Sequence, residues 1–241
     1  MAKRVLVAGF EPFGGEKVTP SELLARSFEG RIVGGRQVAV RVIPVETRNV
    51  RERFETALHE DDPDIVIAIA QFGGRTALSL ERVAVNVLDF DFPDNVGVMR
   101  KGDVISRGGA EARISNLPFE RIMEAWQGNA VPGYVSNSAG TFIGNQGLYE
   151  ILGLTEHAVP PVVVGLLHVP YLPAQAIAAG PESNPSMSLE LMKKGLEVLI
   201  ETVVPWVEQR SSDSSRPGAA QPGAAPKKSM WIPRGVKEVE R

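Results

Sequence analysis

The sequence of 241 residues contains no cysteine. This absence excludes disulfide bonds, thiolate metal sites and a cysteine nucleophile. An excess of charge of one sign is also missing, because 26 lysines and arginines against 29 acidic residues give a net charge of −3. The composition therefore gives no electrostatic reason to expect nucleic acid or an anionic membrane surface as a partner. The three histidines are dispersed, so we predict no metal site and no cofactor.

Long hydrophobic runs are missing as well. The N-terminal stretch MAKRVLVAGFEPFGG has only a short apolar run before Gly9, too short for the apolar core of a secretory signal, and no segment approaches membrane-spanning length. We therefore expect a cytoplasmic protein without membrane contact. A hydrophobic content of 43% in 241 residues is typical of one sizeable globular domain.

Apolar runs alternate with amphipathic segments along the chain. Strands are predicted at 4–8, 38–45, 64–70, 133–136 and 162–169, and helices at 21–30, 47–60, 118–127, from about 142 and at 186–209. Segment 79–90 is predicted to form one antiparallel or edge strand, followed by a loop to about residue 110. Thr19, Pro20 and Glu22 indicate an N-cap, a first-turn proline and a capping-box acid, and Gly30 a helix end. The alternation predicts a mostly parallel sheet with helices on both faces.

The composition changes after Arg210. The stretch SSDSSRPGAAQPGAAPKKS lacks aromatic and branched aliphatic residues and repeats PGAA, which is typical of a linker or disordered tail. We therefore expect a folded domain at 1–209 and a tail at 210–241. Trp231 and Ile232 near the end leave open a short anchor on a neighbouring surface.

Chemistry-bearing residues gather in four clusters at predicted strand ends or loops, where open α/β sheets place their sites. They are GFEPFGG (9–15), QFGGRTALSLERVAVN (71–86), SNSAGTFIGN (136–145) and LHVPYLPAQ (167–175), with a fifth motif in PDNVG (93–97). In this order they resemble the pyroglutamyl peptidase I family, also called pyrrolidone-carboxylate peptidases. The resemblance extends from about residue 4 to residue 209.

The resemblance implies a doubly wound three-layer α/β/α sandwich with a mostly parallel twisted sheet, and a homodimer or homotetramer. It also implies a cysteine exopeptidase that removes an N-terminal pyroglutamyl residue with a cysteine, a histidine and an acid. Glu81 falls at the position of the acid and His168 at that of the histidine. The nucleophile position is occupied by Gly144. Glycine has no side chain to attack a carbonyl, so the usual covalent route is closed.

A second departure lies in DFDFPDN, where the family commonly has a basic residue at the position of Asp91. An acid there reverses the field where a negative oxyanion would develop. Smaller departures are Phe72, Gly147 and Ala174. Together these changes affect the chemical part of the site more than the binding part.

The residues matching the binding part are better retained. The resemblance places Phe10 and Phe13 on either side of a lactam ring, Gln71 near the lactam amide, and Phe142 and Ile143 along the same side. An apolar slot with one or two polar groups suits a flat neutral lactam. An N-terminal pyroglutamyl peptide or a small lactam is therefore the expected partner.

Each of these residues also has a structural interpretation. The two phenylalanines of GFEPFGG could close the core, and Gln71 could cap backbone groups. Glu81 could pair with Arg75 or Arg82, and His168 could be a satisfied core histidine. The hydroxyls nearest residue 144 belong to Ser136, Ser138 and Thr141, which are better explained as turn and helix-cap residues than as substitute nucleophiles.

Three functional hypotheses follow. The first is a family member that keeps the fold and the lactam pocket but has lost the thiol mechanism. The second is a binding or scaffolding protein for pyroglutamyl or related small amide ligands. The third, an engineered glycine in an otherwise active enzyme, ranks last because Asp91 and Gly147 would need separate explanations.

Overall fold

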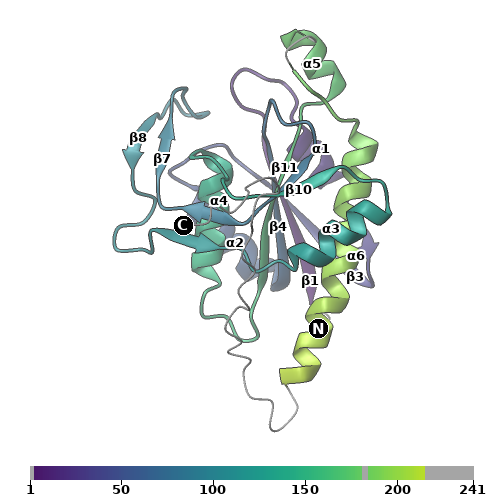
Figure 1. The fold of residues 1–241 in the computed structure, drawn as a ribbon. Coiled ribbons are helices and arrows are strands. Elements are labelled where there is room, and N and C mark those ends of the chain that lie inside the picture. The colour runs from purple at the N-terminus through teal and green to yellow at the C-terminus, as the bar shows by residue number, and fades with distance from the viewer. Residues whose placement is uncertain (1–2, 181–183, 215–241) are drawn as a thin grey trace, which may run out of the picture.

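The computed structural model describes residues 3–180 and 184–214. Its centre is a seven-stranded sheet with the strand order β10-β5-β11-β4-β1-β3-β2 (Figure 1). These strands are β1 (Arg4–Phe10), β2 (Ile32–Val33), β3 (Arg36–Ile43), β4 (Pro63–Gln71), β5 (Leu78–Glu81), β10 (Gly133–Ser136) and β11 (Val163–Val169). Two small sheets pair β6 (Val83–Val85) with β9 (Ala112–Ile114), and β7 (Leu88–Phe90) with β8 (Arg100–Asp103).

The central sheet is mostly parallel. β1 lies parallel to β3 and β4, and β4 parallel to β11. β5 is antiparallel to β11, and β2 is antiparallel to β3. The central strands β1 and β4 are almost wholly buried, as expected for strands covered on both faces. The predicted mostly parallel sheet is confirmed.

Helices cover both faces of this sheet. They are α1 (Pro20–Arg26), α2 (Val50–Asp61), α3 (Phe119–Gly128), α4 (Ile143–Leu154), α5 (Pro173–Ala179) and α6 (Leu189–Ser214). One core joins the sheet to α1, α3 and α6, where Phe28 and Trp126 are buried. The other core joins the opposite face to α2 and α4, where Phe54 and Tyr149 are buried. The predicted three-layer α/β/α sandwich is therefore confirmed (Figure 1).

Several local predictions were wrong. Segment 79–90 is not one strand, because it contributes β5, β6 and β7 to three different sheets, and the expected loop to residue 110 contains β8. Thr19 makes no side-chain cap, since its hydroxyl contacts Ser21 and Gln71 instead. Glu22 pairs with Arg26 rather than with the helix start.

The ends of two helices also differ from expectation. The first helix ends at Arg26, before Gly30. The last helix runs from Leu189 to Ser214, so the domain boundary predicted at residue 210 falls inside it. The rest of the predicted tail, including its Trp-Ile pair, lies outside the described residues.

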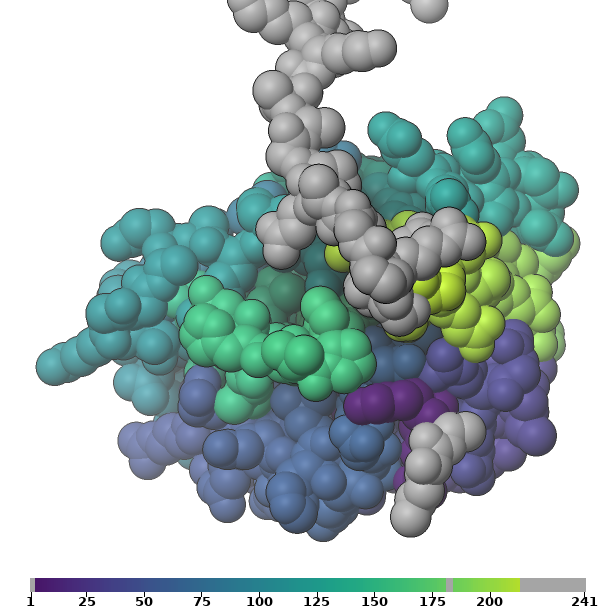
Figure 2. All heavy atoms as spheres, turned by 90° about the horizontal axis from the view of Figure 1, so that it is seen from below, coloured from purple at the N-terminus to yellow at the C-terminus, as the bar shows by residue number. Residues whose placement is uncertain are grey.

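The amino-terminal end of the central strands faces the viewer in Figure 2, where the start of β1 (purple) lies near the end of α6 (yellow). Ion pairs join the segments at this end. Arg4 pairs with Asp61, and Arg36 pairs with both Asp64 and Glu208. The carboxyl ends of the strands therefore form the opposite end of the molecule.

Two further results concern residues 3–180 and 184–214 as a whole. None of the helices there combines the length and the apolar composition needed to cross a membrane. Within the same residues, no three histidine or acidic side chains are grouped so that they could hold a metal ion.

Candidate functional site

A hollow of about 900 Å³ opens at the carboxyl ends of β1, β4 and β11. From β1 the chain runs to β3, which is next to β1 on one side, and then to β4, which is next to β1 on the other side. Open α/β sheets bind ligands at such a switch point in strand order. The end of β1, the end of β4 and the start of α4 all contribute to the lining, as do loops after β7 and β11. The predicted residues in this lining are Phe10, Phe13, Gln71, Phe142, Ile143, Gly144 and His168.

Glu81 and His168 form a buried pair behind this hollow. Glu81 ends β5 and His168 lies near the end of β11, where the two strands run antiparallel. His168 Nδ1 donates to Glu81 Oε1 at 2.8 Å, and the two side chains are 3% and 0% exposed. The carboxylate therefore fixes the ring so that Nε2 is the nitrogen presented to residue 144.

Burial decides the charge state of the histidine. Loss of hydration lowers the pKa of His168 below 6.5, more than the hydrogen bond and the charge of Glu81 raise it. Burial would raise the pKa of Glu81, but its contacts with the side chains of His168 and Ser136 and the positive charge of Arg75 together outweigh that effect and hold the pKa below 4.5. At neutral pH the pair is a carboxylate with a neutral imidazole, which is the form that can accept a proton at Nε2.

The position that this imidazole faces carries no side chain. Gly144 is the second residue of α4, and a Cβ built on it would lie 2.7 Å from His168 Nε2 and 3.2 Å from Ala70 Cβ. The histidine ring is therefore aligned with residue 144. No atom that could attack a carbonyl extends from Gly144.

Arg75 gives Glu81 a second partner. Its Nη1 donates to Glu81 Oε1 at 2.5 Å and also contacts the hydroxyl of Ser79. The guanidinium lies 4.0 Å from the centre of the Phe72 ring, which meets the His168 ring edge-on. Glu81 therefore contacts both the histidine that it orients and Arg75, with which it forms a buried ion pair.

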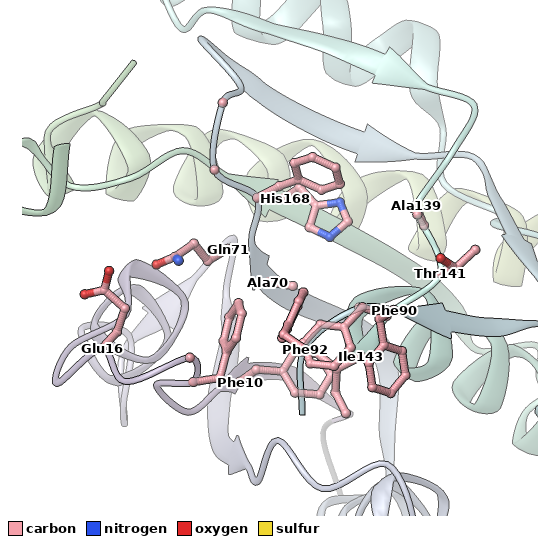
Figure 3. Close-up of a pocket in the computed structure, with 18 of the residues that line it drawn as sticks. Phe10, Glu16, Ala70, Gln71, Phe90, Phe92, Ala139, Thr141, Ile143 and His168 are labelled. Atoms are coloured by element: carbon pink, nitrogen blue, oxygen red, sulfur yellow. The ribbon is translucent and has the colours of Figure 1, made fainter. Parts of the chain in front are cut away.

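Aromatic rings form the wall across the hollow from His168 (Figure 3). Phe13 packs against Phe142 at 5.4 Å between ring centres and against Phe92 at 6.0 Å. Phe142 also meets Phe90 at 4.7 Å. Phe10 also lines the hollow, but it is 1% exposed and packs mainly into the core beside Phe54 of α2.

Gln71 lies at the end of β4, at one end of the hollow (Figure 3). Its side-chain oxygen accepts hydrogen bonds from Gln175 at 3.0 Å and from Thr19 at 3.4 Å. These bonds occupy the side-chain oxygen, so the amide nitrogen is the group of this side chain that can donate to a ligand. A donor here matches the carbonyl oxygen of a lactam.

Asp91 lies at the rim of the hollow. Its side chain is 89% exposed and pairs with Lys101, which is also 3.7 Å from Asp89. The lysine therefore balances part of the negative charge introduced at this position. Lys101 itself is not among the residues that line the hollow, whereas Asp89 and Asp91 are.

The hydroxyls near Gly144 all take part in hydrogen bonds with other residues. Ser136 Oγ donates to the carbonyl of Ser138 at 3.2 Å, and Thr141 Oγ1 donates to the carbonyl of Asp89 at 2.6 Å. The amide of Gly140 donates to Ser138 Oγ at 3.4 Å. The contacts of the two serines are turn contacts, as expected, whereas that of Thr141 joins it to β7, and no side chain caps the start of α4.

Sequence reasoning missed part of the lining. Phe90 and Phe92 complete the aromatic wall, and Glu16 and Asp89 bring carboxylates to it. The alternation of acids and aromatics in LDFDF was the available signal. A single strand over 79–90, as the sequence predicts, gives no reason to bring both phenylalanines to one site.

Comparison with known proteins agrees with this geometry. Residues 3–205 match the pyroglutamyl peptidase family. A pyrrolidone-carboxylate peptidase of Coprothermobacter proteolyticus is 37% identical over 206 residues, covering 86% of this chain and 99% of the relative. That of Pyrococcus furiosus is 39% identical over 207 residues, covering 83% and 100%. The solved structure of a mutant pyrrolidone carboxyl peptidase from Pyrococcus furiosus superposes with a TM-score of 0.81 at 39% identity, covering 85% of this chain and 99% of that one.

Proposed function

Because this chain belongs to the pyroglutamyl peptidase family, we propose that it binds an N-terminal pyroglutamyl residue or a related small lactam without thiol-dependent hydrolysis. The observation that carries the proposal is the Glu81–His168 pair, which is complete but faces the bare Cα of Gly144. The lactam ring packs against Phe13 and Phe142, and Gln71 donates to its carbonyl oxygen.

The chemical step is lost for a structural reason. In a thiol hydrolase the imidazole takes a proton from the nucleophile, whose sulfur then attacks the carbonyl. His168 can accept that proton, but the chain has no cysteine and therefore provides no thiol at residue 144 or anywhere else. Asp91 adds a second loss, since an acid disfavours the oxyanion that such an attack creates.

The test combines hydrolysis and binding. A chromogenic pyroglutamyl amide is assayed with the unmodified chain, with Gly144→Cys and with Gly144→Ala. The alanine variant is the matched control, because it adds the same Cβ against His168 Nε2 without a thiol. We expect turnover only in the cysteine variant, and calorimetry should show binding of L-pyroglutamyl amide to the unmodified chain.

The results separate the hypotheses. Since an oxyanion donor contributes about 10²- to 10³-fold in rate, Gly144→Cys with Asp91→Arg should exceed Gly144→Cys alone. Turnover by the unmodified chain at the rate of the cysteine variant would contradict the proposal. Binding without turnover in any variant would favour the second candidate, a binding or scaffolding protein, which the retained aromatic wall also supports.

A further inference from the structure

We infer that the hollow selects pyroglutamyl ligands in which the residue after the lactam carries a positive charge. This inference rests on the proposed function, because it concerns the part of the ligand that extends beyond the lactam ring. Three observations support it: the charges that line the hollow, the place of those charges at its rim, and the aromatic faces between them.

Charge in the lining has one sign. Glu16, Asp89 and Asp91 line the hollow, whereas no lysine or arginine is among its described lining residues. His168, which also lines it, is neutral at neutral pH because burial lowers its pKa. The hollow therefore presents a negative potential to any ligand that enters it.

The carboxylates lie at the mouth rather than at the base. Glu16 is exposed and lies at the same end as Gln71 (Figure 3). The side chains of Asp89 and Asp91 are 53% and 89% exposed. A lactam beside His168 would thus sit below these charges, and the following residue would pass among them.

Nearby cations offset only part of this charge. Lys101 contacts both aspartates, so the three lining carboxylates and the one ammonium paired with them leave two net negative charges. Arg75 is held by Glu81 behind the hollow and balances that buried carboxylate instead. The rim therefore favours a cation and disfavours an anion.

The aromatic wall adds an attraction of the same sign. Phe92 is 40% exposed, and it packs against both Phe13 and Phe142. A cation within about 6 Å of a ring face is attracted by the negative face of the ring. An ammonium or guanidinium between this wall and the aspartates would be stabilised by both.

The test compares three dipeptide amides of similar size. Pyroglutamyl-lysine amide, pyroglutamyl-glutamine amide and pyroglutamyl-glutamate amide differ in charge but share the lactam. Calorimetry at low salt should rank their affinities in that order, with about tenfold or more between the lysine and glutamate peptides. The difference should shrink as salt increases, because the rim is exposed to solvent.

Variants of the chain assign the effect to the rim. Asp91→Asn and Glu16→Gln should each reduce the preference for lysine over glutamate about threefold. Lys101→Gln should increase this preference, because the substitution removes the positive charge that is paired with Asp89 and Asp91. Asp62→Asn is the matched control, since Asp62 is also an exposed aspartate paired with one lysine, Lys3, but lies at the end of α2.

The outcomes distinguish this inference from the function on which it rests. Equal affinities for all three peptides, or tighter binding of the glutamate peptide, would overturn the inference while leaving lactam binding in place. Failure of every peptide to bind, including the neutral one, would overturn both. An equal effect of Asp62→Asn and Asp91→Asn would show that net charge rather than the rim is responsible, and would also overturn it.

Discussion

At the scale of single residues, Gly144 and the Glu81–His168 pair must be explained together. The pair retains a structural role even without a nucleophile, because Glu81 is fully buried and needs the hydrogen bond from His168 and the ion pair with Arg75. Removing either partner would leave the buried carboxylate with fewer hydrogen bonds and less positive charge around it, which would destabilise the folded protein. The retained pair is therefore compatible with a lost reaction.

The buried histidine makes the stability of the protein depend on pH. Burial lowers the pKa of His168 in the folded state below its ordinary value of 6.5. As pH falls below 6.5, the unfolded chain binds a proton at this residue before the folded chain does, so the free energy of unfolding decreases. The slope from one such group is at most about 1.4 kcal/mol per pH unit. Glu81, whose folded pKa lies below 4.5, adds a loss of the same sign at lower pH.

Urea unfolding at pH 7.5, 6.5 and 5.5 checks this prediction. We expect the free energy of unfolding to fall between pH 6.5 and 5.5, and to fall less steeply in His168→Gln, which cannot titrate. His59→Gln is the control, because it removes an exposed histidine of α2 by the same change and keeps His168. A slope that His168→Gln does not reduce would mean that another group is responsible.

At the scale of elements, the start of α4 is built around two glycines. A Cβ on Gly147 would lie 2.8 Å from Phe10 Cζ and 3.3 Å from Phe54 Cε2. Gly147 therefore lets the helix approach the end of β1, and the ring of Phe10 occupies the space that a side chain would need. The position of Phe10, which lines the hollow, thus depends on Gly147, a helix residue that does not line the hollow.

Gly147→Ala tests this dependence. Alanine favours the helix by up to about 1 kcal/mol, but the overpacking against Phe10 should cost about 1–3 kcal/mol. We expect net destabilisation of about 1 kcal/mol in urea unfolding and weaker binding of L-pyroglutamyl amide by calorimetry. Gly128→Ala is the control, because a Cβ there meets no atom within 4 Å, and it should stabilise slightly without changing binding. Unchanged binding and increased stability in Gly147→Ala would contradict this role.

Contacts made by the start of α4 show why part of the fold could not be predicted from the sequence. Continuous apolar runs such as residues 64–70 identify the central strands, because burial on both faces leaves a local signal. The path of residues 85–89 has no such signal. Asn145 bonds the backbone of Val85 and Val87, and Thr141 bonds the carbonyl of Asp89. These contacts come from far along the chain, so alternation alone could not separate β6 from β7.

The candidate site divides in a similar way. Motifs that resemble the family identified Glu81, Gly144 and His168, because their identities and order are specific. Phe92 and Glu16 lie beside such motifs, but their place in the lining depends on how β7 and the loop after β1 fold toward α4. Their contribution therefore became visible only with the tertiary structure.

At the scale of the whole molecule, Arg36 joins three segments at the end of the sheet opposite the hollow. It donates to Asp64 at the start of β4 at 2.7 Å and to Glu208 in α6 at 3.1 Å. The side chains of Arg36 and Asp64 are 13% and 8% exposed. By contrast, the side chains of Arg31 and Glu197, which also form an ion pair, are each 38% exposed.

We therefore predict that Arg36→Met destabilises the protein by about 3 kcal/mol, because it leaves the carboxylate of Asp64 buried without its counter-charge. Arg31→Met, the matched change at the more exposed pair, should cost about 1 kcal/mol or less. Adding Asp64→Leu to Arg36→Met should recover most of the loss, since replacing both members of a buried pair by apolar residues is often close to neutral. Urea unfolding at pH 7 measures all three variants. Equal losses in the two arginine variants, or no recovery in the double variant, would show that the buried charge is not what joins α6 to the sheet.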